Sequence, residues 1–296
     1  MTEHVDVVVV GAGQAGLSIS HELAHAGIDH VVLERGRVGE AWRRRWDSFC
    51  LVIPNWTVQL PGGRYSGGDP DGFMPRDDIV AHLAGYARSF GAPVREGGNV
   101  SSLAAGEDGG FIRRTSSGEI RARQVVLASG GYQKPHRPPA AQLPASLHAI
   151  HAEDYTNPEA LPPGPVLVVG SGQTGCQLSE ELAEAGRETY LSCGRAPWIP
   201  RRLDGRDTIA WIVETPFMDI TLADLPSPRA RLGANPQASG RRGGRDLHYR
   251  TLQALGVHML GHLIGVEDGV AHFAPDVADC VAFGDEELCG SGNKIT

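Results

Sequence analysis

The sequence predicts an α/β protein with two Rossmann-like dinucleotide-binding domains, each built on a three-layer parallel sheet. The first observation is a repeated phrase, GAGQAGLSISHELAHAG at residues 11–27 and GSGQTGCQLSEELAEAG at residues 170–186, in which ten of seventeen positions are identical. The second is the apolar run before each copy, VVVV at 7–10 and VLVV at 166–169, which is typical of a buried parallel strand. The third is the helical spacing of Leu and Ala after each glycine turn.

Each turn carries glycine at three places that a dinucleotide fold requires. The first glycine allows a tight exit from the strand, the second lets the backbone approach a pyrophosphate, and the third lets the helix pack on the strand. The predicted contact residues are Gly11, Gly13, Gln14 and Gly16 in the first copy, and Gly170, Gly172, Gln173, Thr174 and Gly175 in the second. The free N–H groups of each helix start would face the phosphates. The alternative is two ordinary strand-to-helix turns.

An acidic residue follows the second predicted strand of the first unit. Residues 30–33 form that strand, and Glu34 comes 18 residues after Gly16, close to the spacing of about 20 for the acid that binds a ribose diol. A carboxylate accepts hydrogen bonds from ribose hydroxyls and repels a 2′-phosphate, so this site favours FAD or NAD over NADP. Arg35, the next residue, belongs to the same predicted site. The alternative is a solvated glutamate at a strand end.

The second unit lacks this acid. Cys193 occupies the position that matches Glu34, and three arginines follow it, Arg195, Arg201 and Arg202. A 2′-phosphate requires cationic donors and no neighbouring carboxylate, so this site favours NADP. The alternative is a solvated basic loop.

Composition excludes several classes of protein. The chain has 296 residues, 41% hydrophobic and 21% charged, and its net charge of −8 argues against nonspecific nucleic-acid binding. The start, MTEHVDVVVV, lacks the basic region of a signal peptide, and no stretch has transmembrane length, so we expect a cytoplasmic protein without membrane association. Five scattered cysteines without a CxxC pair weigh against a dithiol–disulfide flavoprotein. His258 and His262 have helical spacing, and packing is favoured over metal binding.

Further elements divide the chain into domains. A helix is predicted at 79–90 after a capping Asp77 or Asp78, a hairpin at 111–128, and a helix at 246–255 followed by a strand at 257–260. Eight prolines between 135 and 165 predict a connector. We therefore expect an FAD-binding domain at 1–160, an NADP-binding domain at 161–278, and an unstructured tail at 279–296.

Taken together, these passages resemble the flavin-containing monooxygenases, in particular the bacterial branch related to Baeyer–Villiger enzymes. Besides the two turns, the resemblance is carried by the run from Gly39 through Trp42 to Pro54, by Ser129 and Gly130 with Tyr132, and by His151 and Tyr155. The family's motif F-x-G-x-x-x-H-x-x-x-Y/F/W is half matched, because Ala145 and Leu147 replace its Phe and Gly. The family's FAD domain is normally completed by a later strand and helix, which this sequence does not show.

The resemblance implies an NADPH- and FAD-dependent monooxygenase. NADPH would reduce FAD, and the reduced flavin would form a C4a-peroxide with O2 that transfers one oxygen atom to a small organic substrate by N-, S- or Baeyer–Villiger oxidation. Trp42, Ser129 and Gly130 would contact the flavin, and Asn55 would donate to the flavin or the peroxide. The resemblance is compatible with a homodimer. Two alternatives remain open: a flavin/nicotinamide reductase without oxygenation, and a catalytically incomplete nucleotide-binding module.

Overall fold

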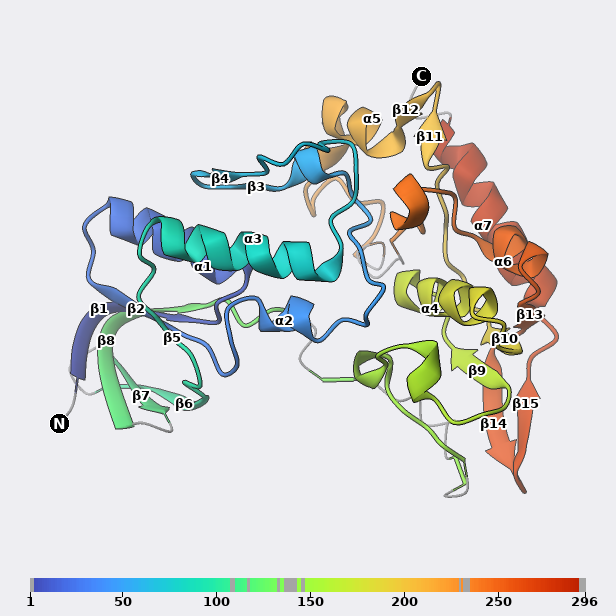
Figure 1. Cartoon of the computed structure of the whole chain (residues 1–296), viewed down its shortest axis with the longest axis horizontal. Helices are drawn as coiled ribbons and strands as arrows, with labels where there is room; N and C mark the ends of the chain where they lie inside the picture. Colours follow the sequence, from blue (N-terminus) through green and yellow to red (C-terminus); the bar gives the residue numbers. More distant parts are fainter. Residues whose placement is uncertain are drawn as a thin grey trace. The chain divides into compact units, whose positions relative to one another are not determined.

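The chain forms two compact units in the computed structural model. The structure describes residues 3–106, 110–115, 118–131, 134–135, 143–144, 147–228, 230 and 235–292. The first unit comprises 1–49 and 54–135, and the second comprises 50–53 and 136–296 (Figure 1). Residues 136–160 thus fall in the second unit, whereas the sequence analysis placed them in the FAD-binding domain. Their assignment to either cofactor domain stays a prediction.

The first unit contains a six-stranded sheet in the order β5-β2-β1-β8-β7-β6. Its strands are β1 (Glu3–Val10), β2 (His30–Leu33), β5 (Val94–Arg95), β6 (Val100–Ala105), β7 (Phe111–Thr115) and β8 (Gly118–Leu127). The pairs β5/β2, β2/β1 and β1/β8 are parallel, and β8/β7 and β7/β6 are antiparallel. The parallel strands β1 and β2 bury Val8 and Val31, as expected for strands with an apolar surface on both faces.

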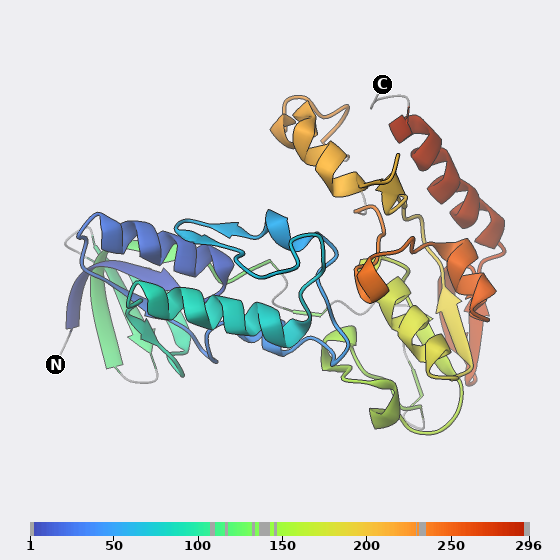
Figure 2. The same ribbon diagram turned by 45° about the horizontal axis from the view of Figure 1, so that its top comes forward.

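Two helices lie side by side against this sheet, α1 (Gln14–His25) and α3 (Arg76–Ser89) (Figures 1 and 2). On α3 the buried side chains include Ile79, Leu83 and Tyr86, the face expected from the sequence. The helix begins at Arg76 after Pro75, however, so the expected Asp77 or Asp78 cap is wrong. Proline fits that place because it has no N–H that needs an intrahelical partner.

Short elements complete the first unit between β2 and α3. They are α2 (Glu40–Arg43), the 3₁₀ turn η1 (Asn55–Thr57), β3 (Gln59–Leu60) and β4 (Gly63–Arg64). The strands β3 and β4 pair as an antiparallel hairpin.

The second unit contains a parallel sheet in the order β13-β10-β9, formed by β9 (Val166–Val169), β10 (Thr189–Ser192) and β13 (His258–Leu260). Helix α4 (Gln173–Glu184) connects β9 to β10 and buries Cys176, Leu178 and Leu182. The predicted helix at 246–255 is α6 (Tyr249–Ala254), and β13 lies within the predicted strand. The remaining elements are η2 (Ala152–Asp154), η3 (Pro158–Ala160), β11 (Arg202–Leu203), β12 (Arg206–Asp207), α5 (Thr208–Glu214), η4 (Pro216–Asp219), η6 (Arg241–Gly243), β14 (Leu263–Glu267), β15 (Val270–Phe273) and α7 (Val277–Gly292).

Helix α7 corrects the prediction of a tail at 279–296, because residues 279–292 are helical and 293–296 lie outside the described residues. The sequence analysis overlooked an apolar face. Cys280 is buried in the core of the second unit, and Val281 packs against the same core. A Cβ on Gly284 would lie 3.2 Å from the Ala196 carbonyl oxygen, so the helix approaches its neighbours closely there. Burial of this face stabilises the helix although the segment is acidic.

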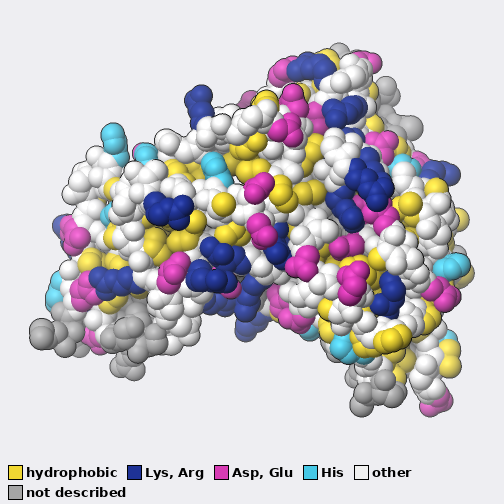
Figure 3. Space-filling view, viewed as in Figure 1, with side chains coloured by type: hydrophobic (Ala, Val, Ile, Leu, Met, Phe, Trp, Pro, Cys, Tyr) yellow, Lys and Arg dark blue, Asp and Glu magenta, His cyan; other side chains and the backbone are white. Residues whose placement is uncertain are grey.

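Acidic and basic side chains are both spread over the face shown in Figure 3. Among the described residues, no helix combines the length and the apolar character needed to cross a membrane.

Candidate cofactor-binding sites

At two positions of the first glycine turn, only glycine fits. Gly11 follows β1 with φ of 108°, in the left-handed region, and a Cβ there would lie 2.5 Å from the Ala128 carbonyl oxygen. A Cβ on Gly16 would lie 1.9 Å from the Gly11 carbonyl oxygen. These contacts agree with the turning and packing roles expected for the two glycines. The close approach of Ala128 also brings Ser129 and Gly130, both exposed, to the edge of this turn.

Gly13 differs from these two glycines because a Cβ at this position would point into open space. It is the N-cap of α1, and within 4 Å of a Cβ placed there the structure describes no atom beyond its own neighbours. No side chain of the described residues caps the helix. Its first N–H groups, including that of the exposed Gln14, therefore face an open region that a diphosphate fits.

Glu34 lies beside this turn and not away from it. It follows β2, is 8% exposed, and its Oε2 accepts from the Ala12 N–H at 2.8 Å while Oε1 accepts from the Gly36 N–H at 2.8 Å. A carboxylate oxygen has a second lone pair, so each can still accept from a ribose hydroxyl. Arg35, the next residue, is exposed. The residues at the first turn therefore fit the adenosine half of FAD.

Two residues carried over from the family resemblance lie outside this turn. The Trp42 ring, in α2, packs against Phe49 with ring centroids 5.6 Å apart. Asn55 is 4% exposed; its Nδ2 donates to the Asp69 carbonyl at 2.9 Å, and its Oδ1 accepts from the Met74 N–H at 2.7 Å. The Asn55 amide thus holds the 69–74 loop, and the catalytic role expected for it stays a prediction. Tyr132, which also supported the resemblance, lies outside the described residues, as does Ala145.

The second glycine turn repeats the geometry of the first. Gly170 has φ of 100°, and a Cβ on Gly175 would lie 1.8 Å from the Gly170 carbonyl oxygen. Gly172 is the N-cap of α4 without a side-chain cap from the described residues, and a Cβ on it would meet no described atom within 4 Å. Thr174 is half-buried in the first turn of α4. This helix start therefore also has room for a diphosphate.

A segment far along the chain covers the start of α4. The Gln173 Nε2 donates to the Ala238 carbonyl at 2.6 Å, and its Oε1 accepts from the Ala238 N–H at 3.1 Å. Gln237 is buried and its Nε2 donates to the Ser171 carbonyl. The Gln173 side chain is therefore engaged by protein, and its backbone is the part that remains for a cofactor. Sequence reasoning missed this segment because 65 positions separate the partners.

The arginines of the second unit have different environments. Arg195 is exposed, and Arg202 is exposed with Nη2 donating to the Gly243 carbonyl at 3.0 Å. Arg201 is 2% exposed; it pairs with Asp207, and its Nη1 donates to the Val52 carbonyl at 2.7 Å. The predicted phosphate contact is therefore wrong for Arg201 in this structure, because burial and these partners hold its guanidinium inside the protein.

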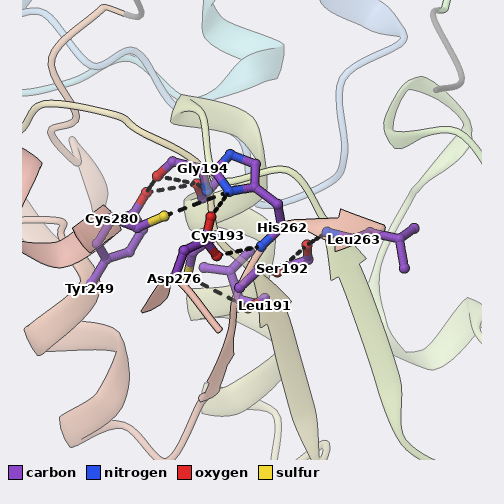
Figure 4. Close-up of polar contacts among 11 residues, drawn as sticks. Leu191, Ser192, Cys193, Gly194, Tyr249, His262, Leu263, Asp276 and Cys280 are labelled. Carbon is purple, nitrogen blue, oxygen red and sulfur yellow. Dashed lines mark hydrogen bonds and ion pairs between the residues drawn. The ribbon is translucent and has the colours of Figure 1, made fainter. Parts of the chain in front are cut away.

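A hydrogen-bond network joins the second turn to the end of β10 (Figure 4). The Ser171 Oγ accepts from the Gly194 N–H at 2.7 Å and lies 2.7 Å from the Tyr249 hydroxyl, which donates to the Gly194 carbonyl at 2.5 Å. Burial raises the pKa of Tyr249, which keeps this hydroxyl protonated as a donor. The network fixes Gly194 against the turn, immediately after buried Cys193, where the first unit has Glu34.

Helix α4 is also held by buried carboxylates. The Tyr155 hydroxyl donates to Glu181 at 3.2 Å, which anchors the half-matched family motif to this helix. Glu180 is buried and pairs with Arg245 at 2.9 Å, yet burial raises its pKa. Arg241 and Arg245, from the basic run RRGGR at 241–245, both pair with α4 carboxylates.

The fold and the two turns define a protein with two dinucleotide-binding folds. The profile of the family described as pyridine nucleotide-disulphide oxidoreductase matches residues 8–221. The chain belongs to this family. The match extends over both glycine turns.

Relatives of known name are oxidoreductases. The chain is 37% identical over 223 residues to an uncharacterised oxidoreductase of Geobacillus kaustophilus, covering 74% of this chain and 63% of the relative. It is 32% identical over 208 residues to an indole-3-pyruvate monooxygenase of Oryza sativa, covering 68% of this chain and 51% of the relative. The chain therefore spans between half and two thirds of the length of these relatives.

Solved structures agree on the fold. A variant of the flavin monooxygenase of Stenotrophomonas maltophilia aligns with a TM-score of 0.67 and 22% identity, covering 92% of this chain and 76% of that one. The predicted α/β architecture and the resemblance to flavin monooxygenases are thus confirmed.

Proposed function

We propose that the chain is an NADPH- and FAD-dependent monooxygenase that binds FAD at the first glycine turn and NADPH at the second. One observation carries the proposal. The two turns have the same glycine geometry, but a carboxylate lies beside the first and a buried cysteine takes its place beside the second. A carboxylate selects a ribose diol, and its replacement admits a 2′-phosphate.

The residues of each turn have distinct tasks. At the first turn, Gly13 leaves space for the pyrophosphate, and Glu34 accepts from the ribose hydroxyls while Ala12 and Gly36 fix its carboxylate. At the second turn, Gly172 provides the same space, and exposed Arg195 offers a cation. When bound, the flavin accepts hydride from the nicotinamide and supplies the oxygen chemistry.

Oxygenation of a small organic substrate is supported by the rice relative and by the resemblance stated above. Three outcomes of one experiment separate this proposal from its alternatives. The purified chain is reconstituted with FAD, its visible spectrum is recorded, and NADPH oxidation, O2 uptake and hydrogen peroxide are measured with sulfide, amine and ketone substrates.

A monooxygenase is yellow and yields product in step with NADPH oxidation. A reductase is yellow and releases all the consumed O2 as peroxide. A nucleotide-binding module stays colourless. The second or third outcome contradicts the proposal.

A further inference from the structure

His262 lies at the edge of the second turn, although the sequence indicated only packing for it. It follows β13, the strand that contains His258, so the two histidines do not lie on one helix. Its side chain is 51% exposed. The Nδ1 atom lies 2.6 Å from Oδ2 of Asp276, and the His262 N–H donates to Oδ1 of the same carboxylate at 3.1 Å (Figure 4). Asp276 therefore fixes the orientation of the ring.

The other ring nitrogen faces Gly194. A Cβ on Gly194 would lie 3.5 Å from the His262 Nε2 and 3.7 Å from the Ser171 Oγ. The hydrogen bonds of Ser171 and Tyr249 hold Gly194 in this place. The imidazole thus lies beside Gly194 at the end of β10. Gly194 comes one residue after Cys193, which is the counterpart of Glu34, the carboxylate proposed to bind ribose in the first unit. Because Gly194 has no side chain, it leaves the His262 Nε2 uncovered at this residue.

Charges of both signs lie around the ring. Asp276 is the carboxylate that contacts the ring, and it also receives the His262 N–H; the hydrogen bond from His262 holds the pKa of Asp276 below its usual range. The Cys280 Sγ lies 3.9 Å from the His262 Nδ1. Burial raises the pKa of the Cys280 thiol, the charge of Asp276 raises it further, and the Arg195 guanidinium opposes this shift. Asp279 also acts on Cys280 from α7.

Resting on the proposed NADP role of this turn, we propose that His262 binds the ribose 2′-phosphate through Nε2 and so helps the second site to choose NADP over NAD. With Nδ1 engaged by Asp276, a protonated ring presents its Nε2–H outward as a charge-assisted donor. Arg195 supplies a second cation.

The test compares His262→Gln with wild type in equilibrium titrations of the full chain with NADP+, NAD+ and adenosine 2′,5′-bisphosphate. Loss of one charge-assisted hydrogen bond is expected to weaken NADP+ and the bisphosphate about tenfold and to leave NAD+ unchanged. His258→Gln is the matched control, because this exposed histidine on β13 stacks on Tyr190 with centroids 4.8 Å apart. It is expected to bind all three probes like wild type.

A failure of the role assigned to His262 can be distinguished from a failure of the NADP role of the second turn. Equal weakening of NADP+ and NAD+ by His262→Gln would show a structural role and overturn the assignment, as would unchanged NADP+ affinity. Asp276→Asn is expected to weaken NADP+ less than His262→Gln and to spare NAD+; no change there contradicts the orienting role of Asp276. If wild type binds neither NADP+ nor the bisphosphate, the NADP role of the second turn itself fails.

Discussion

A methyl group on Gly13 should weaken flavin binding without unfolding the protein. Gly13 is the N-cap of α1 with φ of −83° and ψ of −172°, which alanine adopts without strain, and no described atom would lie within 4 Å of the new Cβ. The free energy of unfolding of Gly13→Ala should therefore stay within about 0.5 kcal/mol of wild type in the absence of flavin. The methyl group would instead fill the space through which a diphosphate reaches the helix N–H groups.

The expected loss of FAD affinity follows from the hydrogen bonds that the methyl group would displace. Displacing one charge-assisted bond to a phosphate costs about 1.5–3 kcal/mol, so FAD should bind roughly 10 to 100 times more weakly. Gly16→Ala gives the contrast, because its Cβ would lie 1.9 Å from the Gly11 carbonyl oxygen and must displace backbone. It should destabilise even the flavin-free protein, by about 1–3 kcal/mol or more.

The assay pairs urea unfolding of the flavin-free variants with fluorescence titration of FAD. Gly68→Ala is the matched control, since Gly68 is exposed and a Cβ there meets no described atom within 4 Å. Wild-type FAD affinity in Gly13→Ala would refute the placement of the diphosphate. Destabilisation of flavin-free Gly13→Ala as large as that of Gly16→Ala would refute the claim that the space is open.

Four further predictions follow from single side chains. Burial lowers the pKa of His248 from its usual 6.5, so the unfolded chain takes up the proton more readily as pH falls; stability to urea should drop from pH 7 to 5, and less so in His248→Gln. Asn55→Ala leaves a loop N–H and a loop carbonyl without their partner and should lower the free energy of unfolding by about 2 kcal/mol in thermal or urea unfolding. Burial raises the pKa of Cys193 to about 12 and also raises that of Cys176, so a thiol reagent counted by mass spectrometry should label both only after unfolding. Arg195→Ala should weaken NADP+ but not NAD+ in titrations, with an unchanged melting temperature, because the side chain is exposed.

Local patterns explain which features the sequence could predict. A strand, a glycine turn and a helix lie within about twenty residues, and the glycine spacing depends only on backbone close to it in sequence, so both turns have the expected geometry. The buried face of α3 follows in the same way from the spacing of Ile79, Leu83 and Tyr86.

Features that depend on distant partners could not be predicted. Arg201 and Arg195 are equivalent in the sequence, but Asp207 and the Val52 carbonyl bury the first, while the second stays exposed. His262 reaches the second turn only because β13 pairs with β10 in parallel. A spacing rule cannot separate these cases, since the tertiary contacts decide them.

The most direct test of the central claim, that each turn holds a different dinucleotide, is a crossed titration of Gly13→Ala and Gly172→Ala with FAD and NADP+. The account predicts that Gly13→Ala weakens FAD and leaves NADP+ unchanged in the flavin-free protein, and that Gly172→Ala does the opposite. If either variant weakens both cofactors equally, or if wild type binds only one of them, the account of two dedicated sites is contradicted.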